Sequence, residues 1–308
     1  MSEAVLAEPV AGRSRRRRFG AELTPYLFLA PALIATAVIV FLPVIQTIAM
    51  SLYDYVLYRP RSIPFVGLGN YARLWADEVF WISLWNSVLW VLLTVALQFL
   101  LGFAAALLLN ESFIWRPLAR AAVIIPWALP SVIIALMWTW MYDFNLGVFN
   151  DALTRLGLIQ RPQAWLATPD TALYAVILAL TWQGFPFFAV VILAGLQAIP
   201  GELYEAAEID GAGRWQSFRY VTIPGLAAVI ATALLLRIIW VANSLDVILV
   251  MTGGGPGYAT HTLPLYAFLR AYSGMEFGYG AALAVVLTVT LLALVALYVA
   301  RAQRGSER

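Results

Sequence analysis

The chain has 308 residues, of which 62% are hydrophobic and 12% are charged, and its formal net charge is +2. A soluble domain of this size needs more charge to cover its surface, so we expect most of the chain to contact lipid. It has no cysteine and one histidine, His261, which excludes a disulfide framework, thiolate chemistry and a histidine-rich metal site. All 19 basic residues are arginine, and without lysine the chain cannot form a nucleotide-binding P-loop.

Six apolar segments lie between a basic N-terminal tail, residues 1–24, and a short C-terminal tail, residues 301–308. Each has the roughly 20 residues that cross a hydrocarbon core of about 30 Å, and each must be helical because lipid offers no partner for backbone N–H and C=O groups. The first is too long for a signal-peptide core, so we expect it to be retained. Pro126 and Pro130 are expected to kink the third. The predicted spans are 25–51, 83–109, 120–141, 171–197, 224–251 and 280–300.

The uneven distribution of arginine over the loops predicts the orientation of the chain. If the N-terminus lies inside, twelve arginines fall on the inner side and six on the outer side, while Arg237 lies within a span. This excess predicts that both termini lie in the cytoplasm. Arginine without lysine is typical of a GC-rich bacterial genome, so we expect a multi-pass protein of a bacterial cytoplasmic membrane. The arginines at 15–18 are then expected to retain the N-terminus inside rather than to bind nucleic acid.

The connection between the fourth and fifth spans, residues 198–223, differs from the other loops. It reads as a short helix with acidic residues such as Glu205 near its positive N-terminal end, a stop at Gly211 and a second short turn before Pro224. An amphipathic helix lying on the bilayer is the weaker interpretation, because anionic lipid would repel the acidic face. A small, knob-like contact surface is expected on one side of the helix, formed by Leu203, Ala206, Ala207 and Asp210.

Arg237 lies about thirteen residues into the fifth predicted span, near the bilayer centre. An arginine there costs roughly 2.5–3.5 kcal/mol on insertion scales and should face protein or water. Trp240 and Ser244 follow at i+3 and i+7, which predicts one helical face that carries donors, an aromatic plate and a hydroxyl. This stripe suits a polyol. The alternative is that Arg237 packs against helix carbonyls of a partner subunit.

The connection 198–223 resembles the EAA loop of binding-protein-dependent ABC import permeases, with EAA at 205–207, Gly211, and Ile-Pro at 223–224. Over about residues 25–300 the chain resembles the carbohydrate branch of that family, the maltose-type permeases. The maltose-transporter subunit has extra N-terminal spans and a large outer domain, so this chain is more similar to the leaner six-helix form. The other segments that carry the resemblance are FVGLGNY at 65–71, PWALP at 126–130 and TGGGP at 252–256.

The resemblance implies an all-α integral membrane protein with six transmembrane helices, the type I ABC importer permease fold and a cytoplasmic coupling helix. It implies a sugar as cargo, a second homologous permease, two copies of a cytoplasmic ATPase that bind ATP and Mg²⁺ in place of this chain, and an extracytoplasmic solute-binding protein. ATP binding would switch the cavity from inward- to outward-facing. The residues implied in coupling are Glu205, Ala206, Ala207, Asp210 and Gly211.

The resemblance also implies a substrate site, because six positions coincide with sugar-contacting positions of the maltose-type permease when the EAA loops are aligned. Val241 departs from the pattern, since the maltose permease has a polar amide there, so the sugar contacts are expected to differ in detail. The roles of Asn243 and Asp246 stay open. The implied substrate-binding residues are Gln183, Gly184, Phe187, Arg237, Trp240 and Ser244.

Two other transport functions remain as alternatives. An ABC permease for an anionic polyol phosphate, such as glycerol 3-phosphate, would use Arg237 as a counter-charge. An ion-coupled secondary transporter usually has titratable groups within its spans, and here Asp246 is the only carboxylate there. An enzyme is not expected, because no histidine lies within a span and the glycines at 253–257 are followed by no lysine.

Overall fold

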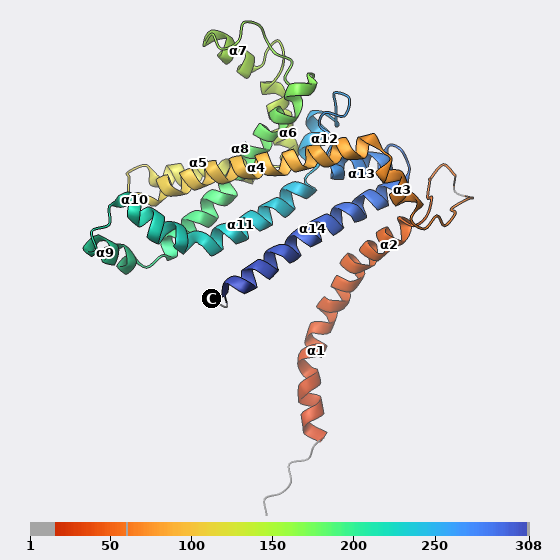
Figure 1. Ribbon diagram of the computed structural model, residues 1–308, viewed down its shortest axis with the longest axis horizontal. Coiled ribbons are helices and arrows are strands. Elements are labelled where there is room, and N and C mark those ends of the chain that lie inside the picture. The colour runs from red at the N-terminus through yellow and green to blue at the C-terminus, as the bar shows by residue number, and fades with distance from the viewer. Residues whose placement is uncertain (1–15, 60, 307–308) are drawn as a thin grey trace, which may run out of the picture. The chain divides into compact units, whose positions relative to one another are not determined.

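The computed structural model describes residues 16–59 and 61–306, and all regular elements in these ranges are helical (Figure 1). The chain divides into two compact units between Ala49 and Met50. In chain order the elements are α1 (Arg16–Thr36), the π-helical segment η1 (Ala37–Phe41), α2 (Leu42–Met50), α3 (Gly69–Trp75), α4 (Glu78–Asn110), α5 (Arg116–Ala128), α6 (Ser131–Met141), α7 (Val148–Arg155), α8 (Pro169–Ala198), α9 (Gly201–Ile209), α10 (Arg214–Ser217), the π-helical segment η2 (Phe218–Thr222), α11 (Ile223–Asn243), α12 (Asp246–Met251), α13 (Leu263–Tyr272) and α14 (Phe277–Ser306).

The first unit consists of α1, η1 and most of α2, which follow one another without an interruption of the helix. Its apolar part, Tyr26–Met50, has 25 residues and a mean hydropathy of 2.6. Such a helix is about 37 Å long, which is enough to cross a bilayer with some tilt. The first predicted span, 25–51, is therefore confirmed as a helix of membrane-spanning length.

The second unit contains the other candidate spans. The apolar helices confirm the second, fourth, fifth and sixth predicted spans, and each begins somewhat before its predicted start. Together with the first unit, the described residues hold five helices that are long and apolar enough to cross a membrane, or six if one bent pair is counted as a span. The four in the second unit are Glu78–Asn110, Pro169–Ala198, Arg214–Met251 and Phe277–Ala300.

The third predicted span is not one kinked helix but two helices, α5 and α6, bent by 97° at the break between them. Leu129 and Pro130 both have extended backbone, with ψ of 140° and 138°. A proline clashes with a helical conformation of the residue before it and donates no backbone hydrogen bond, so the helix stops at Ala128 and restarts at Ser131. The prediction of a distortion at this proline is confirmed, and its size was underestimated.

Helix α8 forms the centre of the second unit. In its most apolar 18 residues 61% are buried, compared with 11% in α14. It packs mainly against α4, and α5 and α11 lie against it as well. Small residues permit these close approaches: a Cβ at Gly102 of α4 would lie 2.5 Å from the Cβ of Phe188 in α8. The cavity described below is therefore lined on one side by the most rigidly packed helix of the fold.

A polar clasp joins the start of α4 to α13 and α14. Asp77 caps α4 by accepting a hydrogen bond from the amide of Val79 at 2.9 Å. The hydroxyls of Tyr266 and Tyr279 both donate to its Oδ2 atom at 2.5 Å. Burial by itself raises the pKa of Asp77, but these hydrogen bonds outweigh it and hold the pKa below its ordinary value. The guanidinium of Arg270, 5.0 Å from the Tyr279 ring, completes the clasp.

Candidate functional site

A cavity of about 290 Å³ lies where two broken helices meet, the α5–α6 pair and the α11–α12 pair, against α8. Its walls combine aromatic, basic, acidic and hydroxyl groups. Four of the six residues predicted for substrate binding line it, namely Gln183, Arg237, Trp240 and Ser244. The complete lining is Trp127, Ser131, Leu180, Gln183, Arg237, Trp240, Val241, Ser244 and Asp246.

Arg237 is buried, with 7% of its surface exposed, and its guanidinium is held by α4. Its Nε atom donates to Oε1 of Gln98 at 2.6 Å, and the Nε2 atom of Gln98 donates in turn to the backbone oxygen of Leu180 at 2.7 Å. A short hydrogen bond with a charged donor is stronger than one between neutral groups. The prediction that Arg237 faces protein is confirmed, and its partner is a side chain of the same chain.

Gly184 has no side chain, and the Arg237–Gln98 pair occupies the space where a Cβ atom would lie. A Cβ placed on it would lie 1.8 Å from the NH2 atom of Arg237 and 2.2 Å from Nε2 of Gln98. No larger residue fits without displacing that pair, because real Cβ atoms essentially never approach another atom within 3.0 Å. Gly184 itself does not line the cavity. It positions a lining residue instead.

Aromatic side chains form one wall of the site. Phe187, 6% exposed, lies behind the cavity lining and contacts the rings of Trp240 and Trp127, with centroid distances of 5.2 and 6.2 Å. The Cζ atom of Arg237 lies 5.9 Å from the Phe187 centroid. Trp240 and Trp127 are themselves about half exposed. Phe187 therefore supports two indole rings that are available for contact with a ligand.

Ser244 reaches the cavity for a different reason from the predicted one. The helix α11 ends at Asn243, and Ser244 has extended backbone with ψ of 125°. The i+7 spacing from Arg237 therefore does not place it on a helical face. The backbone oxygen of Val241 explains the geometry, because it accepts from the Ser244 amide at 3.1 Å and from Nε1 of the buried Trp90 at 3.0 Å. This anchor fixes the point where the chain leaves the helix.

Asp246 is an acidic group in the same cavity, at the first position of α12. Its carboxylate accepts a hydrogen bond from the hydroxyl of Ser131, the first residue of α6. Among the described residues no ion pair joins Asp246 to Arg237. The cavity thus presents one cation and one anion that do not neutralise each other by direct contact.

Sequence reasoning missed several residues of this site. Gln98 carried a usable signal, because an amide in the middle of an apolar span needs a partner. Trp127 was part of a quoted motif but had no role assigned. Ser131 and Leu180 carried no signal, since a serine or a leucine is common in membrane helices. Asp246 was noticed without a role, and the structure places it in the cavity.

The segment after α8 has the predicted two short helices, α9 and α10. Gly211 has φ of +82°, a left-handed conformation that favours glycine, and it ends the first helix as predicted. The hydroxyls of Tyr204 and Thr222 lie 3.0 Å apart and tie α9 to η2. Contrary to the expectation of a separate start at Pro224, α10 and η2 continue into α11 without a break.

The five residues predicted for coupling are all in this segment and mostly reach solvent. Glu205, Ala206, Asp210 and Gly211 are exposed, and Ala207 is half-buried. Apolar side chains are exposed beside them: Leu203 is 51% exposed and Ile209 is 87% exposed. A protruding surface of small, apolar and acidic groups suits contact with another protein.

The fold and these two sites define an integral membrane transport subunit, and comparison with known families identifies its kind. Residues 98–305 match the family of binding-protein-dependent transport system inner membrane components, and the chain belongs to this family. It is therefore a permease subunit of an ATP-binding cassette importer, which works with an ATPase and a solute-binding protein, and not an enzyme. Membership in this family also excludes the ion-coupled secondary transporter.

Named relatives are similar over almost their whole length. The chain is 41% identical over 273 residues to the trehalose/maltose transport system permease protein MalF of Thermococcus litoralis, covering 89% of this chain and 91% of the relative. It is 38% identical over 279 residues to the sulfoquinovosyl glycerol transport system permease protein SmoG of Agrobacterium fabrum, covering 91% and 90%.

A solved structure confirms the fold. A chain of a bacterial ABC transporter involved in the import of the acidic polysaccharide alginate superposes with a TM-score of 0.80 at 22% identity, covering 94% of this chain and 98% of that chain. The same transporter in complex with an alginate pentasaccharide-bound periplasmic protein gives a TM-score of 0.79 at 23% identity. The predicted type I permease fold is thereby confirmed.

Proposed function

We propose that this chain carries an uncharged di- or oligosaccharide across the cytoplasmic membrane through the cavity around Arg237. Sugars present hydroxyl groups that both donate and accept hydrogen bonds and ring faces that pack on aromatic side chains. The cavity offers donors on Arg237, an acceptor on Asp246 and the indole of Trp240. The relatives named for trehalose/maltose and sulfoquinovosyl glycerol transport support a cargo with a sugar unit.

An uncharged cargo is favoured because both Arg237 and Asp246 line the same cavity. A phosphate ester such as glycerol 3-phosphate would be attracted by the guanidinium of Arg237 but repelled by the carboxylate of Asp246. An acidic sugar, like that named for the alginate transporter, meets the same repulsion. A neutral polyol uses both groups as hydrogen-bonding partners.

The remaining assignments form part of the same proposal. Residues 25–300 are the permease domain, flanked by the tails 1–24 and 301–308, with both termini in the cytoplasm. This chain pairs with a second homologous permease, and two copies of the ATPase hold the ATP and Mg²⁺. The coupling surface docks on an ATPase copy through Glu205, Ala206, Ala207, Asp210 and Gly211, which is supported by its exposure.

The function is tested by the ATPase activity of the complex reconstituted with its solute-binding protein. Maltose, trehalose, glucose and glycerol 3-phosphate are compared for the wild type, Arg237→Ala and Asp246→Asn. We expect a neutral disaccharide to stimulate hydrolysis, and both variants to reduce the stimulation about tenfold, because a hydrogen bond to a charged group contributes about 1.5–3 kcal/mol. Arg155→Ala, which removes an exposed arginine paired with Asp151 on α7, is the control.

Three results would contradict the proposal. Stimulation by glycerol 3-phosphate alone would make Arg237 a counter-ion. Undiminished stimulation by the disaccharide in Asp246→Asn would show that Asp246 does not bind the sugar. An equal effect of Arg155→Ala and Arg237→Ala would show that the cavity is not the cargo site.

A further inference from the structure

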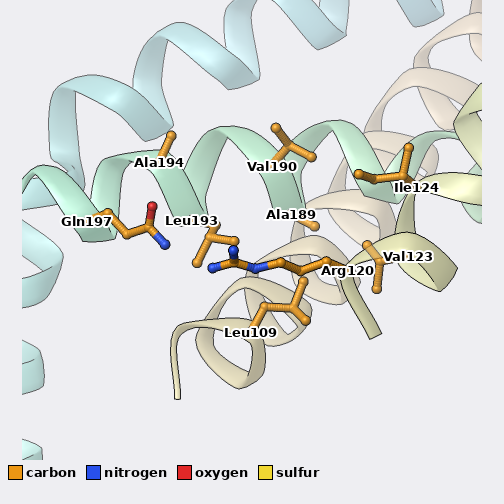
Figure 2. A pocket seen from close by; sticks show the side chains of 9 residues that line it. All are labelled: Leu109, Arg120, Val123, Ile124, Ala189, Val190, Leu193, Ala194 and Gln197. Carbon is orange, nitrogen blue, oxygen red and sulfur yellow. The ribbon is translucent and has the colours of Figure 1, made fainter. Parts of the chain in front are cut away.

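A second cavity, separate from the proposed cargo site, lies between α5 and the end of α8 (Figure 2). Its volume is about 260 Å³. Seven of its nine lining residues are aliphatic, and the two polar ones are Arg120 and Gln197. Figure 2 shows the guanidinium of Arg120 extending past Leu109 and Leu193 toward the amide of Gln197. The cavity is therefore an apolar groove with one positive charge in it.

Arg120 has no partner for its charge among the residues that the structure describes. Its Nε atom is buried without a hydrogen bond, and no carboxylate of the described residues forms an ion pair with it. Between residues 59 and 270, the other arginines either have a hydrogen-bonding, acidic or aromatic partner or are exposed. Burying a polar atom of a charged group without a partner costs free energy, so we expect an anion to bind in the groove.

Arg116, one turn earlier on α5, differs from Arg120 because its guanidinium has a hydrogen-bonding partner. Its Nε atom donates to the backbone oxygen of Leu109 at 2.8 Å and so binds a free carbonyl at the end of α4. The Nε atom of Arg120 makes no such hydrogen bond. Its side chain lies in the groove instead.

The position of the groove matches the level of lipid headgroups. Arg120 is four residues from the start of α5, about 6 Å along the helix axis. Gln197 is the penultimate residue of α8. Both polar groups thus lie near helix ends on the side of the second unit that carries α9. Of the aliphatic lining residues, those of α5 and α8 lie further from these ends, and Leu109 lies at the end of α4. Basic pockets between membrane helices on this side are suited to anionic headgroups.

We propose that this groove binds one anionic phospholipid, with its phosphate at Arg120 and Gln197 and part of an acyl chain along α8. The volume is below the roughly 300–1,000 Å³ of a pocket for a whole drug-sized ligand, so the groove holds the phosphate and only part of a chain. Val190, Leu193 and Ala194 provide the apolar wall. A free anion would not use this wall.

The test is native mass spectrometry of the full chain, alone and in its assembled complex, with phosphatidylglycerol or phosphatidylcholine. We expect one phosphatidylglycerol per chain to be retained in preference to phosphatidylcholine. Arg120→Gln should weaken its binding about fivefold, the effect of removing one basic residue near an anionic lipid. Arg219→Gln, which removes an exposed arginine of η2 on the same side, should have no effect.

A second pair of variants tests the apolar wall with the charge left intact. Ala194→Phe fills the groove and should also reduce retention, whereas Ala198→Phe makes the same change one turn further along α8, outside the lining. Inorganic phosphate that binds with the same dependence on Arg120 and no dependence on Ala194→Phe would overturn the proposal in favour of a free-anion site. Equal retention of both lipids would also overturn it. So would binding that is lost when the partner subunits assemble, because the groove would then belong to an interface.

Discussion

At the scale of single residues, the proposed cargo site depends on side chains that do not line it. Gln98 has 0% exposed surface, yet it fixes the guanidinium of Arg237. Gly184 contributes only the absence of a side chain. Both act as positioning residues, so their replacement should change the site without removing any group that faces the cavity.

Gln98→Leu should remove the acceptor that holds Arg237 and leave a buried charge without its partner. We expect the cargo-stimulated ATPase activity of the reconstituted complex to fall about tenfold, since losing a hydrogen bond to a charged group costs about 1.5–3 kcal/mol. Gln98→Glu keeps an acceptor for Arg237 but loses the donor to the Leu180 oxygen, so it should retain more activity than Gln98→Leu and less than the wild type. Equal losses in the two variants would show that Gln98 is needed only for packing.

At the scale of elements, the turn between α9 and α10 depends on one backbone conformation. Gly211 has φ of +82°, and a Cβ on it would meet nothing within 4 Å. Any effect of a side chain there must therefore come from the backbone and not from a clash. Gly201 also has open space for a Cβ, but it lies within α9 and lacks a positive φ. The two glycines form a matched pair.

Gly211→Ala should destabilise the turn by about 1–2 kcal/mol, the cost of a left-handed conformation for a residue with a Cβ. We expect more ATP to be hydrolysed for each sugar transported, because the coupling surface is no longer held in one position. Gly201→Ala should leave this ratio unchanged, since alanine is favourable in a helix. If the ratio of ATP hydrolysed to sugar transported rose in both variants, or in neither, the conformation of Gly211 would have no specific role in coupling.

The polar clasp at Asp77 gives the fold a dependence on pH. The folded-state pKa of Asp77 is below its ordinary value, so its carboxylate stabilises the fold above the unfolded pKa of about 3.9. This stabilisation is lost as the pH falls through the folded-state pKa. A carboxylate that caps a helix and accepts from Tyr266 and Tyr279 thus links three helices more strongly when it is ionised.

Asp77→Asn should lower the Tm of the purified protein at pH 7, and the difference from the wild type should shrink as the pH is lowered toward 3. The reason is that protonation weakens the same hydrogen bonds in the wild type that the substitution weakens at every pH. Thermal unfolding at a series of pH values measures this. Glu78→Gln removes the exposed neighbouring carboxylate and should show no such convergence. If the difference in Tm between Asp77→Asn and the wild type did not change with pH, the ionised carboxylate of Asp77 would not be what stabilises the fold.

At the scale of the whole molecule, the orientation in the membrane is open to a direct test, because the chain has no cysteine. Single cysteines at exposed loop positions then report only their own location. A membrane-impermeant maleimide should label Ser62→Cys in intact spheroplasts and Ser112→Cys only after permeabilisation. The reverse pattern would invert the proposed topology and move the coupling surface to the outer side.

Five of the six predicted spans, all except the third, were predictable from the sequence because apolar length alone decides them. A segment in lipid must satisfy its own backbone, and only a helix does so. The EAA loop was predictable for a similar reason, since Pro200, Gly211 and the acidic residues determine the local backbone. Four of the six residues expected to bind the substrate line one cavity, and their contact with a cargo stays a prediction. The reason given for Ser244 was wrong, because nothing local predicts that α11 ends at Asn243.

The tertiary structure decided how the cavity is built. Gln98 and Arg237 are 139 residues apart in the chain, and Ser131 and Asp246 are 115 apart, so no periodicity connects them. The third span was expected to kink, but the 97° bend that brings Ser131 to Asp246 depends on how α6 packs against α12. Composition fixes which segments enter the membrane because lipid acts on each segment separately. Packing fixes which polar groups meet, because each of them must find its partner on another helix.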